Sequence, residues 1–243
     1  MARHIVCFGD SNTHGYFPVT GSPGYGRFSE EQRWPRLLQK NLGDGYLVFE
    51  EGLTGRTTAF DDPNRESMNG LASVYSCVMS HEPVDLLVVM LGTNDVKERF
   101  GLEAKEIAGG MEQLLRKAAS LPAWKDGTPR ILLMAPPVID SEWSRDYHRK
   151  SEELVGLYKT LAEENGWLFL DAGSVGEFNR VDHMHLTAQS HAALASRVAE
   201  IVRGYFKESR QDNTGNPRIP DKNLPVTDEF LLDLQGVSGG EIL

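Results

Sequence analysis

The chain has few of the features that mark a disulfide-rich or a membrane-spanning protein. Only two of its 243 residues are cysteine, and two cysteines in a chain of this length are typical of buried thiols and not of a disulfide framework. Long apolar runs are also missing, since the longest, Val84 to Leu91, is interrupted by Asp85. A membrane-spanning helix needs roughly 20 apolar residues, so none is expected.

Basic character is scarce as well. The 25 Lys and Arg residues are outnumbered by 35 Asp and Glu residues, which gives a formal net charge of -10, and no cluster of Lys and Arg interrupts this acidic balance. Nucleic acids and anionic membranes are recognised through a basic face that counters phosphate charge. The sequence therefore predicts neither a nucleic-acid partner nor a membrane partner.

What remains is the composition of an ordinary globular protein. With 40% hydrophobic and 25% charged residues, the chain can bury one sizeable core. The segment before Gly9 holds only four consecutive apolar residues, too few for the apolar region of a secretory leader. We therefore expect a cytoplasmic protein.

Short β-rich runs alternate along the chain with longer amphipathic stretches. Strand alternating with helix indicates right-handed crossovers and a parallel sheet with helices on both faces. The fold expected is a flavodoxin-like three-layer α/β sandwich with five strands in the order 2-1-3-4-5. The predicted strands are 5–8, 46–50, 86–91, 130–135 and 167–170, and the predicted helices are 34–41, 71–80, 104–121, 145–165 and 187–206.

Two segments depart from this alternation. Residues 16–33 are rich in Gly and Pro without clear periodicity, which predicts a long loop directly after the first strand, a common place for binding loops. From about residue 208 the chain becomes polar and is punctuated by Pro and Gly. We predict a catalytic domain over 1–207 and a C-terminal extension over 208–243, and we expect both segments to contribute to a homo-oligomer.

Residues that can do chemistry stand where the predicted strands end. Ser11 follows the first strand, Gly52 the second and Asn94 the third, while Asp182 and His185 precede the last helix. The carboxyl ends of parallel strands meet at one edge of a sheet, where ligands bind in folds of this type. The five residues are therefore expected to converge on one site.

Their chemistry suggests a role for each of them. A serine hydroxyl needs a base to take its proton, and a histidine imidazole is the natural base near neutral pH. An aspartate three residues before His185 can accept from Nδ1–H and leave Nε2 facing Ser11. The backbone N–H groups of Ser11 and Gly52 and the side-chain amide of Asn94 can stabilise an oxyanion, and glycine at position 52 permits a close backbone approach.

Four motifs of this chain resemble the conserved blocks of the SGNH (GDSL) hydrolase family, in the same order. They are Gly-Asp-Ser at 9–11, Gly52, Gly-Thr-Asn-Asp at 92–95 and Asp-His-Met-His at 182–185. The similarity extends over about residues 3–206, and the segments 50–58, 61–63 and 90–95 resemble the bacterial arylesterase and acyltransferase branch. The tail beyond about residue 209 has no counterpart in this family.

The resemblance implies the SGNH hydrolase fold, with Ser11, Asp182 and His185 as catalytic triad and with Gly52 and Asn94 completing the oxyanion hole around Ser11. It also implies a homo-oligomer whose neighbouring subunits narrow the entrance to the site, and no cofactor or metal. We expect a serine esterase that hydrolyses small short-chain acyl esters, acetyl or aryl, through an acyl-Ser11 intermediate. Transfer of the acyl group to an alcohol instead of water is left open.

Two other functions compete with this interpretation. In a metal-dependent phosphoesterase, the ligands would be scattered residues such as Asp10, His14, Asp95, His183 and His185, but two imidazoles two positions apart point to opposite faces of an extended segment. A non-catalytic flavodoxin-like binding module would show a missing triad member or a phosphate-cradling loop after the first strand, and the sequence shows neither.

Several further residues admit either a structural or a binding role. Asp10 is expected to hold the turn at Ser11 through hydrogen bonds to the backbone, and Arg56 is expected to be buried for structural reasons. Tyr16, Trp34 and Trp143 can wall an acyl pocket or simply pack against their neighbours.

Overall fold

The computed structural model describes residues 2–19 and 25–211. The chain divides into two units after Gly204. The first unit is built on one parallel sheet with the strand order β4-β1-β5-β6-β7, which confirms the predicted sheet and its 2-1-3-4-5 order. Its strands are β1 (Arg3–Gly9), β4 (Tyr46–Gly52), β5 (Leu86–Met90), β6 (Ile131–Ala135) and β7 (Leu168–Asp171).

The central strands are continuous apolar runs, as expected for a sheet covered on both faces. Every residue of β5 and of β6 is buried. The outer strand β4 is more exposed, because only Val48 of its seven residues is buried. The core therefore lies along β1, β5 and β6, and the strand ends that follow them are anchored in it.

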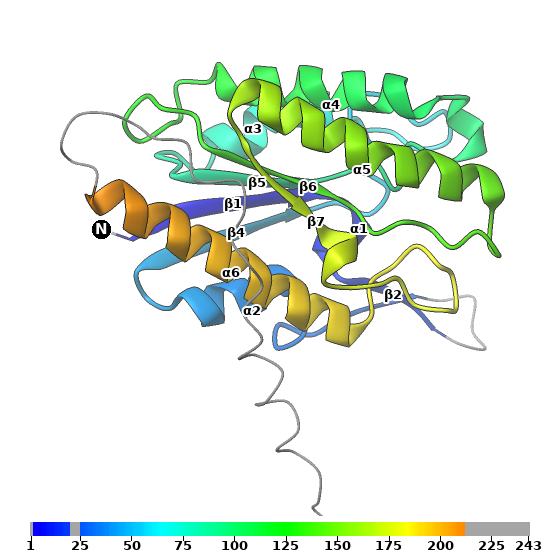
Figure 1. The fold of residues 1–243 in the computed structure, drawn as a ribbon, viewed down its shortest axis with the longest axis horizontal. Coiled ribbons are helices and arrows are strands. Elements are labelled where there is room, and N and C mark those ends of the chain that lie inside the picture. Colours follow the sequence, from blue (N-terminus) through cyan, green and yellow to red (C-terminus); the bar gives the residue numbers. More distant parts are fainter. Residues whose placement is uncertain (1, 20–24, 212–243) are drawn as a thin grey trace, which may run out of the picture. The chain divides into compact units, whose positions relative to one another are not determined.

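Helices cover the two faces of this sheet in separate groups (Figure 1). One face carries α3 (Gly70–Met79), α4 (Ala104–Ala119) and α5 (Arg145–Asn165), and the other carries α2 (Trp34–Leu42) and the part of α6 (Ala188–Gln211) that belongs to the first unit. The predicted helices are thus confirmed, and α5 matches its predicted bounds at both ends.

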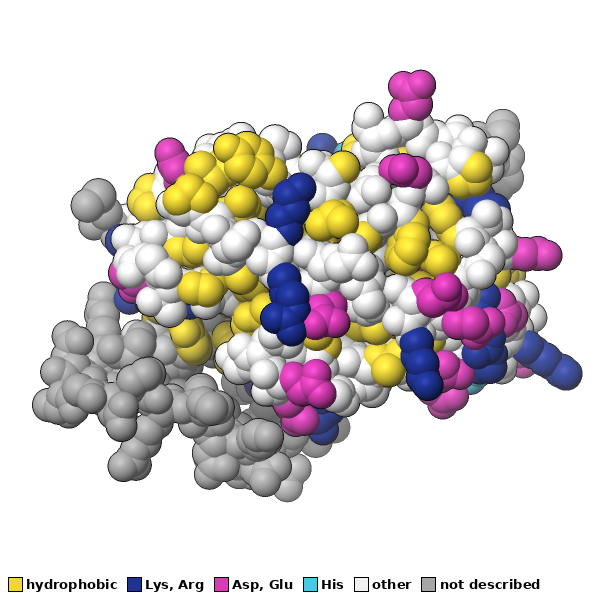
Figure 2. Space-filling model, turned by 90° about the horizontal axis from the view of Figure 1, so that it is seen from above, with side chains coloured by type: hydrophobic (Ala, Val, Ile, Leu, Met, Phe, Trp, Pro, Cys, Tyr) yellow, Lys and Arg dark blue, Asp and Glu magenta, His cyan; other side chains and the backbone are white. Residues whose placement is uncertain are grey.

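The outer surface of α3, α4 and α5 carries acidic and basic side chains close together (Figure 2). Arg149, for example, pairs with Glu103, Asp146 and Glu153 at 2.8, 2.9 and 3.1 Å. Exposed pairs of this kind contribute only about 0–1 kcal/mol each. Among the described residues, no helix combines the length and the apolar composition needed to cross a membrane.

The prediction of an irregular loop over residues 16–33 is wrong at two short strands. β2 (Tyr16–Pro18) pairs antiparallel with β3 (Tyr25–Arg27). The ring of Phe17 lies over its partner Gly26 in this pairing, where a Cβ would lie 2.1 Å from the ring as it stands. The alternation of strand residues that normally signals a hairpin is absent because each strand is only three residues long. Residues 20–24 lie outside the described residues.

The C-terminal extension predicted over 208–243 falls mostly beyond the last described position, 211. Its boundary with the catalytic domain therefore stays a prediction. Both cysteines are free thiols, and Cys7 is buried in β1.

Candidate active site

The serine of the Gly-Asp-Ser motif begins a very short helix, α1 (Ser11–His14), directly at the end of β1. Asp10 caps this helix, as predicted, because its Oδ1 accepts from the backbone N–H of Asn12 at 2.9 Å. The backbone carbonyl of Asp10 also accepts from His14 N at 2.9 Å. Ser11 is only 3% exposed, so both the backbone and the side chain of the nucleophile candidate are held in place.

Two glycines allow α1 to sit this close to the strands. Gly9 and Gly52 are partners in the β1–β4 register. A Cβ at Gly52 would lie 2.3 Å from the backbone nitrogen of His14, and one at Gly9 would lie 2.1 Å from Oγ1 of Thr13. The close approach inferred for Gly52 is therefore made to the backbone of α1 itself, and it places the ends of β1 and β4 side by side next to Ser11.

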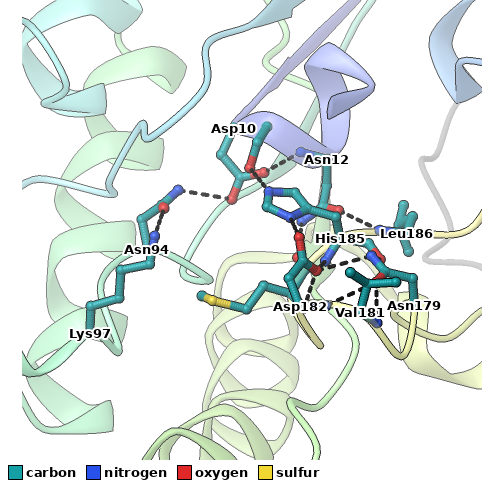
Figure 3. Close-up of polar contacts among 11 residues, drawn as sticks. Asp10, Asn12, Asn94, Lys97, Asn179, Val181, Asp182, His185 and Leu186 are labelled. Carbon is teal, nitrogen blue, oxygen red and sulfur yellow. Dashed lines mark hydrogen bonds and ion pairs between the residues drawn. The ribbon is translucent and has the colours of Figure 1, made fainter. Parts of the chain in front are cut away.

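The loop before α6 brings the other predicted triad members to Ser11. His185 Nε2 lies 2.9 Å from Ser11 Oγ, and His185 Nδ1 lies 2.6 Å from Asp182 Oδ2. With Asp182 accepting from Nδ1–H, Nε2 is left free to accept the Ser11 hydroxyl proton. In Figure 3, Asp10 lies between two groups: Asp182 and His185 are on one side of it, and Asn94 is on the other.

The carboxyl of Asp182 is kept ionised by its surroundings. Burial alone would raise its pKa, but the hydrogen bond and the charge of His185, together with the N–H of Met184 and the Asn179 amide, lower the pKa below its ordinary value. An ionised Asp182 is what the imidazolium formed at His185 would need as a partner.

Asn179 holds both ends of the loop segment that carries Asp182 and His185, and sequence reasoning missed it. Its Nδ2 donates to Asp182 Oδ1 at 3.0 Å and to the carbonyl of His185 at 2.8 Å. Its Oδ1 accepts from Val181 N at 2.7 Å. An Asn three residues before an Asp is the only signal in the sequence, and it is a weak one because such turns are common.

A second asparagine ties this loop to the nucleophile. Asn12 Nδ2 donates to the carbonyl of Met184 at 3.1 Å, and Asn12 Oδ1 accepts from Leu186 N at 2.9 Å. Both contacts bracket His185 in the sequence, so the imidazole is positioned directly against α1. Asn12 is buried, and its bond from Leu186 N is buried as well.

The backbone of the loop is strained at one position. His183 has a φ of 55°, which a residue with a side chain adopts at a cost of about 1–3 kcal/mol. Its N–H donates to the carbonyl of Asn179 at 3.1 Å. The chain thus reverses between Asp182 and His185, and this reversal turns both side chains toward the same point.

Asn94 lies beyond β5 and is oriented by a lysine that the sequence argument did not include. Lys97 Nζ donates to Asn94 Oδ1 at 2.7 Å, so the amide NH2 faces the opposite way (Figure 3). That NH2 donates to the carbonyl of Arg56 at 3.0 Å and reaches Asp10 Oδ2 at 3.5 Å. Because 3.5 Å is the limit of a hydrogen bond, the second hydrogen is the one available to a substrate oxygen.

Two further ionisable side chains, Asp95 and Arg56, are buried next to Asn94. Burial is the main cause that raises the pKa of Asp95, to about 6, although Thr58 donates to Oδ1 from both its N–H and its hydroxyl. The other oxygen, Oδ2, has no partner among the described residues. Arg56 is buried as predicted, with Nη1 donating to the carbonyl of Gly9 at 2.9 Å, so it supports the end of β1.

The histidines proposed for the metal alternative do not come together. His183 Nδ1 lies 3.7 Å from Asp140 Oδ2, whereas His185 faces Ser11 and Asp182. Over residues 2–19 and 25–211, no group of three or more His, Cys, Asp or Glu side chains is placed to hold a metal ion.

The three aromatic residues singled out in the sequence have different surroundings. Trp34 is 1% exposed and belongs to the core. The Tyr16 ring lies against His185 with centroids 4.2 Å apart, so it forms a wall of the site. Trp143 is 51% exposed and stacks on His183.

Comparison with known proteins places this site in a family. The sequence pattern of the GDSL-like Lipase/Acylhydrolase family matches residues 7–193. The chain therefore belongs to the GDSL-like lipase/acylhydrolase family, whose members are carboxylic ester hydrolases. The resemblance inferred from the four sequence motifs is thereby confirmed.

Individual relatives narrow the comparison. An aryl esterase from M. smegmatis is 35% identical, with 84% of this chain and 99% of that chain covered at a TM-score of 0.77. Est24, a carbohydrate acetylesterase from Sinorhizobium meliloti, is 38% identical. The match covers 84% of this chain and 100% of that chain, with a TM-score of 0.77. An acetylxylan esterase from Xylanibacter ruminicola is 28% identical over 228 residues, which are 85% of this chain but only 43% of that protein.

Proposed function

We propose that this protein is a serine esterase that hydrolyses short-chain acyl esters, acetyl and aryl esters among them, through an acyl-Ser11 intermediate. The observation that carries the proposal is the continuous contact from Ser11 Oγ to His185 Nε2 at 2.9 Å and from His185 Nδ1 to Asp182 Oδ2 at 2.6 Å. Membership of the GDSL-like family, and relatives that are aryl and carbohydrate esterases, support it.

In the first half of the reaction, Ser11 Oγ attacks the ester carbonyl carbon while its proton passes to His185 Nε2. The carbonyl electrons move to oxygen, and the N–H groups of Ser11 and Gly52 and the Asn94 amide donate to that oxyanion. The bond to the alcohol oxygen then breaks, and His185 gives its proton to the departing alkoxide. Asp182 remains ionised throughout and stabilises the imidazolium.

In the second half, water takes the place of the alcohol. His185 removes a proton from it, the hydroxide adds to the acyl carbon, and the Ser11 oxygen leaves with the proton from His185. An alcohol in the same position would give a new ester, so acyl transfer is a further activity of the same intermediate. None of these steps uses a cofactor or a metal.

Two features of the cellular form belong to the same proposal. Homo-oligomerisation is supported by the resemblance to the arylesterase branch and by the β2–β3 hairpin at the rim of the site, whose Tyr16 ring lies against His185. A cytoplasmic location is supported by the two free thiols, which suit a reducing compartment. Light scattering at micromolar concentration tests the first, and a monomeric mass would exclude it.

The esterase proposal is tested with a fluorophosphonate and an ester. We expect the fluorophosphonate to add once to the wild-type protein, on Ser11 by peptide mass spectrometry, and to abolish hydrolysis of p-nitrophenyl acetate. Asp182→Asn should react slowly and Ser11→Ala not at all. Label on any other residue, or full activity after labelling, would contradict the assignment of Ser11.

A further inference from the structure

An exposed aromatic side chain stands at the same edge of the sheet as the proposed triad. Trp143 lies in the connection between β6 and α5, and 51% of it is exposed. Its indole stacks on the His183 imidazole with centroids 5.4 Å apart and planes inclined by 21°. Because His183 occupies one side of the indole, the exposed part presents an open aromatic surface.

The position of His183 places this surface beside the reacting groups. His183 directly follows Asp182 and precedes His185 by two residues. His185 Nε2 in turn lies 2.9 Å from Ser11 Oγ, and Trp143 follows the carboxyl end of β6 at the same edge of the sheet at which β1 ends before Ser11. A ring bound to Trp143 would therefore lie beside the loop that carries the base, at the strand edge where Ser11 stands.

The aromatic pair is held in position before any ligand arrives. The backbone N–H of Trp143 donates to the backbone carbonyl of Asp140 at 3.1 Å, and Asp140 Oδ1 accepts from the backbone N–H of Glu142 at 2.8 Å. Asp140 Oδ2 also lies 3.7 Å from His183 Nδ1, which links the turn that carries Trp143 to the catalytic loop. The backbone of the turn is thus fixed, and stacking on His183 limits the movement of the indole, which reduces the entropy lost on binding.

We propose that Trp143 and His183 form a subsite for the sugar ring of an acetylated carbohydrate, an inference that rests on the esterase function proposed above. The negative face of the indole attracts the C–H groups of a pyranose ring, while the ring hydroxyls remain at the rim, where the partly exposed Asp140 carboxylate accepts from them. The acidic rim formed by Asp140 and Glu142 suits a neutral polyol and disfavours an anionic ligand.

A comparison of three acetyl esters tests whether Trp143 binds a sugar ring specifically. The esters are ethyl acetate, phenyl acetate and methyl tri-O-acetyl-β-D-xylopyranoside. Hydrolysis of each ester is measured in a pH-stat as the rate of acid release. We expect Trp143→Ala to lower kcat/KM about tenfold for the xylopyranoside and to change the other two by less than twofold, because binding energy from the non-reacting part of a substrate is lost only where that part exists. Trp143→Phe should restore most of the loss.

Control variants exclude indirect effects. Tyr75 in α3 is 52% exposed, so Tyr75→Ala removes a similarly exposed aromatic ring elsewhere and should leave all three rates unchanged. Equal loss for the three esters, no loss for any of them, or loss for phenyl acetate as large as for the xylopyranoside would overturn the sugar subsite. A lower molecular mass of Trp143→Ala in light scattering would also overturn it, because Trp143 would then be a contact between copies.

A binding measurement distinguishes failure of the subsite from failure of the esterase proposal. If the wild-type protein hydrolyses none of the three esters, the esterase proposal fails, and the subsite is then decided by titrating Ser11→Ala with xylotriose under tryptophan fluorescence. A saturable fluorescence change that is absent from the Ser11→Ala, Trp143→Phe double variant supports the subsite. No change in Ser11→Ala, or the same change in both proteins, overturns it.

Discussion

The two halves of the proposed site are held in different ways. Ser11 is placed by regular structure, because β1 ends in the core and glycines at positions 9 and 52 let α1 pack on the strand ends. Asp182 and His185 lie on a loop without regular structure, which is positioned by the side chains of Asn12 and Asn179. The nucleophile side therefore depends on packing, and the base side depends on a few hydrogen bonds.

This difference predicts how each half responds to change. A packed backbone tolerates the loss of a side chain that only reacts, so substitutions at Ser11 should remove chemistry and leave the fold. A loop held by side-chain amides transmits the loss of one amide to the geometry of the base. Catalytic effects and structural effects should thus separate on the nucleophile side and mix on the base side.

The largest effect is expected for the triad itself. Ser11→Ala and His185→Ala should each lower kcat by about 10⁴-fold or more, and Asp182→Asn by somewhat less, since the three groups act as a unit. Circular dichroism and the thermal midpoint of Ser11→Ala should match the wild-type protein. Near-wild-type turnover of Ser11→Ala with p-nitrophenyl acetate would eliminate the acyl-serine mechanism.

Loss of one oxyanion donor should have the next largest effect. Asn94→Ala is expected to lower kcat about a hundredfold with little change in KM, because the amide acts on charge that develops only in the transition state. Lys97→Met, which frees the Asn94 oxygen but keeps the amide, should cost less than Asn94→Ala. An unchanged kcat in Asn94→Ala would remove Asn94 from this role.

The buried Asp95 provides a test of the packed side through stability. Its pKa is raised to about 6 by burial, whereas an unfolded aspartate ionises near 3.9. The folded protein therefore holds more protons between these values, and this group lowers the free energy of unfolding as pH rises from about 4 to 6, by on the order of 2 kcal/mol.

Asp95→Asn should remove this pH dependence, as measured by urea unfolding at pH 4.5 and 7. His191, whose pKa is lowered to about 3 chiefly by burial, acts with the opposite sign in both proteins, so the difference between them isolates Asp95. A constant difference between variant and wild type at the two pH values would show that Asp95 does not titrate in this range.

A smaller effect is expected on the base side from Asn179→Ala. Freeing the loop should lower kcat about tenfold, because an imidazole shifted by even a fraction of an ångström is a poorer base for Ser11. Asn165→Ala is the matched control, since that amide also caps a backbone carbonyl, of Leu161, at 2.8 Å, but at the end of α5. Equal activity of the two variants would mean that Asn179 does not position the base.

The smallest effect concerns the fate of the acyl group. With a short acyl donor and benzyl alcohol in buffer, a shielded acyl-Ser11 should give benzyl ester in measurable competition with free acid. Gas chromatography at early times gives the ratio. Free acid alone at every alcohol concentration that leaves the protein folded would restrict the enzyme to hydrolysis.

The sequence reveals the reacting groups of both halves, Asp182 and His185 included, but not the residues that position them. The apolar runs of β1, β5 and β6 carry a strong signal because burial on both faces demands it, and Ser11, Gly52 and Asn94 follow from the strand ends. Asn179 and Lys97 were missed because they act through single hydrogen bonds to groups that only the folded chain brings near. The β2–β3 hairpin was missed because its short strands leave no periodicity to detect.

The paired glycines at the ends of β1 and β4 have a consequence for laboratory evolution of this enzyme. A Cβ at Gly52 would meet backbone atoms of α1, which cannot move aside as a flexible side chain would. A mutant library that randomises the site should therefore keep positions 9 and 52 fixed and vary Tyr16 and Trp143 on the surrounding loops. New substrate ranges in this scaffold will come from the rim of the site, while the strand ends under the nucleophile stay closed to variation.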